Sequence, residues 1–305
     1  MKPKHLTNRH TPTAKIGGVN LYNFDADTMV HFDNDNVFVD ISDKFDHPEY
    51  NADNHGHYIR IGSILSEDKS NAKLAKSAAN TEAKTLIYYG APAGSSGVTN
   101  TCSHATVECS ALCLNTSGNG RYDSIQLSRI AKTRFQTYLP GTFYELMRQE
   151  IDYHLTKLDG KEFLAIRPNG TSDQWNHYLD SIVDDYSQVR FYDYTAVPSR
   201  LQKTRDNYHV TLSRKETRSN HNWLRTYYGR HNISAVVTKA VKAELLEAGQ
   251  ICGINVVDFD THDLRLPELD GNNIIGLLSP KGKARGKESG FIVSSVKQLI
   301  SEIKG

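Results

Sequence analysis

Short apolar runs alternate with helix-forming segments along most of the chain. Seven runs from residue 85 onward predict strands, at 85–90, 162–170, 188–195, 207–214, 232–239, 253–263 and 273–280. Helical spacing or helix-forming composition predicts helices at 124–139, 142–158, 172–186 and 240–249. Ser172 suits the N-cap of the third helix and Gly249 the C-cap of the fourth. The last segment, 290–305, predicts a strand that becomes a closing helix.

The beginning of the chain has a different pattern. Residues 1–25 are polar and poorly periodic, which predicts a loose arm. Residues 29–41 alternate around a polar centre, as a β-hairpin does, and 57–65 predict a further strand. Residues 66–84 are rich in Ala and Lys and predict a helix. We therefore expect residues 1–84 to form an arm, a hairpin and a helix that pack on the rest of the chain.

Apolar strands separated by helices indicate a parallel sheet covered on both faces. Such a sheet belongs either to a βα barrel or to a doubly wound fold. Many of the runs end in hydrogen-bonding side chains, and in a barrel these ends converge on one mouth. We therefore predict that residues 85–305 form an α/β domain, a complete or partial (β/α) barrel. The side chains concerned are Arg167, Asn169, Asp193, Thr195, Thr211, Ser213, Thr238, Asp258 and Asp260.

Composition narrows the class of protein. The chain has 305 residues, of which 38% are hydrophobic and 23% charged, as in a soluble globular protein. Lys and Arg number 36 and Asp and Glu 35, and this net charge of +1 argues against bulk electrostatic binding of nucleic acid but allows a local basic patch. No run approaches the roughly 18 apolar residues of a membrane span. The first residues have no apolar core, so we expect a cytoplasmic protein without a secretory signal.

Three of the four cysteines lie within 12 residues, directly after the first strand of the predicted sheet. The spacing of Cys102, Cys109 and Cys113 predicts metal ligation, and thiolates suit an iron–sulfur cluster or zinc. A structural zinc needs a fourth ligand, for which His104 and the distant Cys252 are candidates. A cluster on three thiolates leaves one iron open for a small molecule. Ordinary buried cysteines are the remaining alternative.

Two further groups of polar residues are candidates for binding or catalysis. The segment 167–173 follows a strand and precedes a helix, so its amides and Arg167 suit an anion or carboxylate, although it also fits a simple turn. Asp193 lies among tyrosines at a strand end, and His209 shares one face of a strand with other polar residues. These features fit a binding site, a satisfied core or a solvent-facing edge. The candidate catalytic residues are Arg167, Asp193, His209, Asp258, Asp260 and His262.

The last two candidates lie near the end of the chain. Residues 258–265 combine carboxylates with an imidazole, which suits a hard cation or acid–base chemistry, or else salt bridges in a loop. In the segment 281–287, glycines separate Lys281, Lys283, Arg285 and a further lysine. This basic loop suits contact with a phosphate or a nucleic-acid backbone, or is merely solvated.

Several motifs together resemble a bacteriophage family called gene product 88. They are the cysteine loop followed by SRIAKTRF, then AIRPNGTSDQW, VRFYDYT, NYHVTLS, VVDFDTHDLR and IIGLLSPKGKARGKESGFIV, over about residues 85–297. The resemblance implies a phage protein that works in the host cytoplasm.

The chain also distantly resembles radical S-adenosylmethionine enzymes, which have a partial barrel with a three-cysteine loop after the first strand. This resemblance implies a 4Fe-4S cluster on the three clustered cysteines. It also places Asn169, Gly170 and Thr171 where those enzymes contact the methionine amino group of the cofactor. The spacing differs: the three cysteines here are separated by six and three residues, in place of three and two.

Two functions follow. The first is an iron–sulfur enzyme of radical type that acts on a nucleotide or nucleic acid, with the basic loop on phosphate. The second is a non-enzymatic protein that binds nucleic acid or a host factor and has a structural zinc or cluster.

Overall fold

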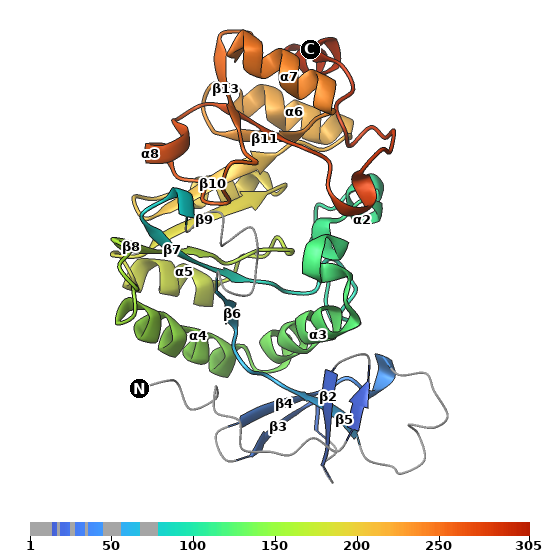
Figure 1. Ribbon diagram of the computed structural model, residues 1–305, viewed down its shortest axis with the longest axis vertical. Helices are drawn as coiled ribbons and strands as arrows, with labels where there is room; N and C mark the ends of the chain where they lie inside the picture. Colours follow the sequence, from blue (N-terminus) through green and yellow to red (C-terminus); the bar gives the residue numbers. More distant parts are fainter. Residues whose placement is uncertain (1–13, 17–18, 25–27, 34–35, 45–55, 68–78) are drawn as a thin grey trace.

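The computed structural model describes residues 14–16, 19–24, 28–33, 36–44, 56–67 and 79–305. Figure 1 shows two sheets, with the helices α3 (Asp123–Tyr138) and α4 (Pro140–Leu155) between them. Leu21 and Val37 of the first sheet belong to the same buried cluster as Phe135 of α3. The N-terminal sheet therefore shares its core with the rest of the chain.

The N-terminal sheet is antiparallel, in the order β1-β2-β5-β4-β3. Its strands are β1 (Ala14–Ile16), β2 (Val19–Phe24), β3 (Val30–Asp33), β4 (Asn36–Asp40) and β5 (Gly56–Arg60). The predicted hairpin is confirmed as β3 and β4, and β5 confirms the next strand. The loose arm predicted for 1–25 is wrong for residues 14–16 and 19–24, because β2 pairs with β5 some 36 residues later, as Tyr22 with Tyr58. Residues 1–13 lie outside the described part.

The second sheet has nine strands, in the order β12-β13-β14-β11-β10-β9-β8-β7-β6. They are β6 (Leu65–Ser66), β7 (Ala83–Tyr88), β8 (Phe163–Arg167), β9 (Arg190–Thr195), β10 (Tyr208–Ser213), β11 (Ile233–Val236), β12 (Gln250–Ile251), β13 (Ile254–Asp258) and β14 (Ile275–Leu278). Seven neighbouring strands run parallel: β7, β8, β9, β10, β11, β14 and β13. The strands β6 and β12 pair antiparallel at the two edges. The predicted α/β fold with a parallel sheet is confirmed. Among the described residues, β6 does not pair with β12, so this sheet has two edges.

The remaining helices cover the sheet and connect its strands. They are α2 (Val107–Ala111), α5 (His177–Asp185), α6 (Arg218–Tyr227), α7 (Lys239–Ala248), α8 (Pro267–Asp270) and α9 (Val296–Lys304). Short 3₁₀ helices are η2 (Ser42–Lys44), η5 (Leu114–Thr116), η6 (Gly118–Arg121), η7 (Pro198–Lys203) and η8 (Gly282–Ala284). The predicted helices are confirmed as α3, α4, α5 and α7, and the closing helix as α9.

Some local predictions are wrong. Asn176, not Ser172, caps α5: its side chain accepts from the Leu179 amide at 3.0 Å, while Ser172 donates to Asn169. Residues 68–78 of the helix expected over 66–84 lie outside the described part. The predicted end of this helix at residue 84 is wrong, because β7 begins at residue 83. The strand expected at the start of 290–305 is reduced to one bridge between Val293 and Val237.

We predict that Gly276→Ala destabilises the parallel sheet. Gly276 lies in β14, and a Cβ there would come within 2.0 to 2.3 Å of the Phe259 ring. Overpacking of this kind typically lowers the free energy of unfolding by about 1 to 3 kcal/mol, as measured by urea denaturation. Gly94→Ala is the control, since a Cβ there meets no atom within 4 Å, and it should leave stability unchanged. Equal stabilities for the two variants would contradict this packing.

Candidate functional site

The loop after β7 reaches across the carboxyl edge of the parallel sheet. We call residues 89–122 the cysteine loop, since they contain Cys102, Cys109 and Cys113. Hydroxyl groups fix its first part: Thr101 Oγ1 donates to the Ala91 carbonyl at 2.6 Å, and Thr171 Oγ1 donates to the Gly90 carbonyl at 2.6 Å. The loop that follows β8 is therefore fastened to the cysteine loop, as expected for neighbouring parallel strands.

The three clustered thiols are half-buried, and they influence one another electrostatically. Burial raises the pKa of Cys102 and of Cys113, and the charge on Cys109 adds to the rise in both. Charge on Cys102 also raises the pKa of Cys113. The three thiols therefore lie near enough to influence one another electrostatically, and the shared metal site stays a prediction.

Two cations lie beside these thiols. Lys215, which follows β10, places its Nζ 3.1 Å from the Cys109 sulfur. Its charge also lowers the pKa of Cys113, against the larger effect of burial. Arg129 of α3 donates from Nη1 to the Asn115 carbonyl at 2.7 Å, and its guanidinium is close enough to Cys113 to interact with the thiolate. An ammonium or guanidinium group favours the charged form of a neighbouring thiol.

The two suggested fourth ligands have different surroundings from one another. Cys252 is in the turn between β12 and β13, at the amino end of β13, where its carbonyl accepts from Tyr228 at 2.8 Å. His104 is exposed, and its Nδ1 lies 3.1 Å from Ser103 Oγ. Within the described part of the chain, no three His, Cys, Asp or Glu side chains are arranged so that they could hold a metal ion.

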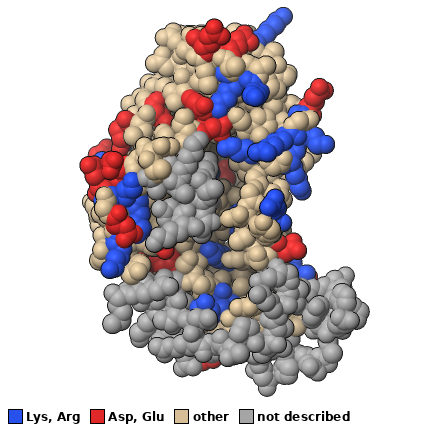
Figure 2. All heavy atoms as spheres, in the orientation of Figure 1, with Lys and Arg blue, Asp and Glu red and all other residues tan. Residues whose placement is uncertain are grey.

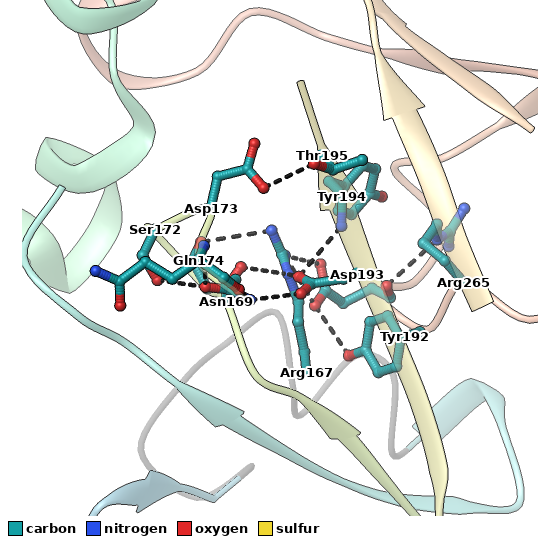
Figure 3. A network of polar contacts seen from close by, with 12 residues as sticks. Arg167, Asn169, Ser172, Asp173, Gln174, Tyr192, Asp193, Tyr194, Thr195 and Arg265 are labelled. Carbon is teal, nitrogen blue, oxygen red and sulfur yellow. Dashed lines mark hydrogen bonds and ion pairs between the residues drawn. The ribbon is translucent and has the colours of Figure 1, made fainter. Parts of the chain in front are cut away.

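A buried polar network lies at the carboxyl ends of β8 and β9 (Figure 3). Asp193 is fully buried and accepts from Asn169 Nδ2 at 2.6 Å and from Arg200 Nη2 at 2.5 Å. The same Arg200 nitrogen donates to Tyr208 Oη at 2.6 Å, and its Nη1 contacts Asp173. Burial raises the pKa of Asp193, against the lowering effect of Arg200 and Arg167. The network joins β8, β9, β10 and η7.

Arg167 extends this network to the loop after β13. It donates from Nη1 to both carboxylate oxygens of buried Asp263, at 3.2 and 3.3 Å, and Tyr192 Oη donates to the same carboxylate at 3.1 Å. Burial also raises the pKa of Asp270 to about 6, although Arg265 lies 3.2 Å from it. The Arg167 guanidinium therefore binds an internal carboxylate of the protein.

The acidic residues at the end of β13 are paired with lysines. Lys242 of α7 lies 2.6 Å from Asp258 and 2.7 Å from Asp260, and Lys281 of the basic loop lies 2.7 Å from Asp260. These ammonium groups outweigh the effect of burial and hold the pKa of Asp260 well below its usual range. Nearby, His262 Nδ1 lies 2.8 Å from Arg265 Nη2. The structure thus brings these candidates together as ion pairs and hydrogen bonds.

The other candidates have different surroundings. Asn169 uses its amide within its own loop, since Oδ1 accepts from Ser172 at 2.8 Å and from the Gln174 amide at 2.9 Å. Gly170 and Thr171 lie against the cysteine loop, and the Thr171 carbonyl is 3.8 Å from Cys102 Sγ. Lys283 and Arg285 are exposed at η8.

His209 lies near the amino end of β10, away from the cysteines. Its Nε2 is 3.2 Å from Asn232 Nδ2. Because the amide nitrogen donates, the ring is neutral and accepts at Nε2. Burial lowers the pKa of His209 to about 4, with contributions from His231 and Arg265.

A cavity of about 630 Å³ opens where the loops after β7, β8 and β9 meet α3. Thr101 and Ser103, on either side of Cys102, line it, and so do Trp175, Arg200 and Lys203. Ligands of α/β proteins commonly bind at the carboxyl ends of parallel strands, and this volume is typical of a small-molecule site.

A family model, Gene product 88, matches residues 64–295. The chain belongs to the gene product 88 family. The match covers 232 of the 305 residues, and it includes the cysteine loop, the polar network and the basic loop. Searches of the curated proteins and of the solved structures gave no match. No helix in the described part of this family member has the length and apolar character to cross a membrane.

Sequence reasoning missed several residues at this edge of the gene product 88 protein. Lys215 comes directly after a predicted strand, so its position at the carboxyl edge was available from the sequence, but its contact with Cys109 crosses 106 residues. Arg200 lies in a connection with no periodic signal, and Trp175, which the sequence placed in the helix 172–186, lies before α5 because that helix begins only at His177. Arg129 lies in the SRIAKTRF motif, within a predicted helix whose orientation the sequence does not give.

The lowered pKa of His209 predicts a loss of stability in acid. The folded-state value of about 4 lies below the ordinary 6.5, so the unfolded chain takes up this proton first as the pH falls. Between pH 6.5 and 4 the wild type should lose up to about 3 kcal/mol relative to His209→Gln, measured by urea unfolding at each pH. His104→Gln, at an exposed position, should follow the wild type. Parallel curves for wild type and His209→Gln would show that this histidine is not held neutral.

Proposed function

We propose that this chain binds an iron–sulfur cluster through Cys102, Cys109 and Cys113 and acts as an enzyme of radical S-adenosylmethionine type. The observation that carries the proposal is that three half-buried thiols, which influence one another electrostatically, share one loop at the carboxyl edge of a parallel sheet, where a cluster would draw their sulfurs together. Their donor set fits the group, since thiolates are the usual ligands of iron–sulfur clusters. When bound, the cluster supplies one-electron reduction.

The charges around the thiols support an anionic group at this site. Three thiolates are negative, and bringing them together in a half-buried place requires compensating cations. Lys215 at 3.1 Å from Cys109 and Arg129 near Cys113 meet that need. Neutral buried cysteines, the alternative, need no ammonium partner.

The surroundings also support a cluster with one open iron. His104 is exposed and Cys252 lies at the amino end of β13, so we expect neither to complete the site. The cavity that reaches the neighbours of Cys102 provides room for a small molecule beside the cluster. We therefore propose that a cofactor or substrate enters through this cavity.

We further propose that the parallel sheet is a partial barrel. The strands β7 to β11 are neighbours in their order along the chain. That sequential order is typical of βα barrels, whereas a doubly wound sheet reverses its order near the middle.

The first experiment is metal analysis after anaerobic purification. The wild type should contain about four irons and four sulfides per chain, with a broad visible band bleached by dithionite. Cys109→Ala should lose most of the iron and the band, while Cys252→Ser, the matched control at the amino end of β13, should keep both. One zinc without iron would replace the cluster by a structural site, and no metal in the wild type would overturn the proposal.

A second experiment tests the cations and the chemistry. Lys215→Gln should make the reduction potential of the cluster more negative, because removing a nearby positive charge disfavours the added electron. Lys239→Gln, an exposed position at the start of α7, is the control. With one electron from dithionite through the cluster, the wild type should also cleave S-adenosylmethionine to methionine and a 5′-deoxyadenosyl radical, which takes a hydrogen atom from the substrate or the reductant and is detected as 5′-deoxyadenosine. If the wild type binds a cluster but does not cleave S-adenosylmethionine, the proposal of cluster binding stands and the proposal of radical chemistry is contradicted.

A further inference from the structure

The basic loop carries three cations that face solvent. Lys283, Arg285 and Lys287 are exposed, and the segment 281–287 contains no acidic residue. Only Lys281 of this segment forms an ion pair among the contacts described, with Asp260 at 2.7 Å. The three exposed cations are therefore available to an anionic partner.

The basic loop is held in place against the cysteine loop. Ala284 is buried, and a Cβ on Gly282 would lie 2.3 Å from Ser117 Oγ, so the two segments are in close contact. A little further on, the Phe291 amide donates to Glu108 Oε2 of α2 at 2.7 Å. The cations are thus presented on a fixed turn, and their positions relative to the cysteine loop are set by packing.

The neighbouring part of the cysteine loop exposes apolar and aromatic side chains. Leu114 is 50% exposed and Tyr122 49%, so both side chains present apolar surface to the solvent. Arg121 lies over the Tyr122 ring at 5.0 Å and donates to its hydroxyl at 2.9 Å. Figure 2 shows Lys and Arg atoms gathered on the side where Figure 1 places α2 and the η8 turn.

We propose that the surface formed by residues 114–122 and the basic loop binds single-stranded nucleic acid. Alternating cations and glycines suit the phosphate backbone, because the charges neutralise phosphates and the glycines let the backbone approach. An exposed tyrosine beside an arginine suits stacking on an unpaired base, which a duplex does not offer. Nucleic-acid binding at this surface does not require a cluster on the cysteines. The idea that the bound strand is also the substrate of the cysteine site rests on the proposed function.

The test measures the fluorescence anisotropy of labelled oligonucleotides of about 20 residues, dT and rU, with the full chain. Between about 50 and 200 mM salt, wild-type affinity should fall steeply. The variant Lys283→Gln/Arg285→Gln/Lys287→Gln should bind more weakly and reduce the salt slope by roughly 2, at about 0.7 for each phosphate contact. Tyr122→Ala should weaken binding by roughly tenfold without changing the slope.

A matched control removes the same charge elsewhere. Lys157 and Arg230 are exposed just before β8 and β11, and exposed Lys304 lies over the ring of Tyr228, which hydrogen-bonds near the start of β13. Lys157→Gln/Arg230→Gln/Lys304→Gln should therefore bind like the wild type, with melting temperatures confirming that all variants fold.

Each of the following outcomes would overturn the proposal: no binding by the wild type, equal weakening in the control variant, or tighter binding of a duplex or of polyglutamate. Cys109→Ala separates this proposal from the previous one. Binding that survives in this variant supports the surface whether or not a cluster is present. Loss of binding there, with the fold intact, would show that the cysteine site and not the basic loop holds the strand.

Discussion

The carboxyl edge of the parallel sheet depends on the buried Asp193 carboxylate and the Arg200 guanidinium that pairs with it. A buried charge is tolerated only when it is paired and its hydrogen bonds are satisfied. Asp193 meets that condition with partners from the loop after β8 and from η7, and Arg200 passes the constraint on to Tyr208 of β10. The loops of three strands thereby take one arrangement, on which the cavity depends.

The cysteine loop is fixed by a second buried arginine. Arg134 of α3 donates to the Ser96 carbonyl at 3.0 Å, to the Asp40 carbonyl at 2.8 Å and to Asp43. The first contact holds the beginning of the cysteine loop, the second holds the end of β4, and the third holds η2. The N-terminal sheet and the proposed metal site are therefore fastened to the same side chain, so damage to that sheet would also reach the loop.

The sequence predicted the parts of the fold that depend on local pattern. Apolar runs predicted the parallel strands, and Gly249 predicted the end of α7. Both signals lie within a few neighbouring residues, so they can be read from the sequence alone. Strand order was not predictable: β14 lies between β11 and β13 through long-range pairing. The helix α6 was missed because, apart from Leu224 and Asn220, its side chains are at least partly exposed.

The same distinction applies to the candidate site. The spacing of Cys102, Cys109 and Cys113 was enough to predict them as candidate ligands. The cations beside them could not be predicted, because their contacts are with residues far along the chain. Asp193, Asp260 and the other carboxylates discussed at this edge bind arginines and lysines of the protein itself. The cations left over lie on the basic loop and beside the thiols. A thiolate-bound cluster and a phosphate backbone are both anionic, so one electrostatic arrangement serves both proposals.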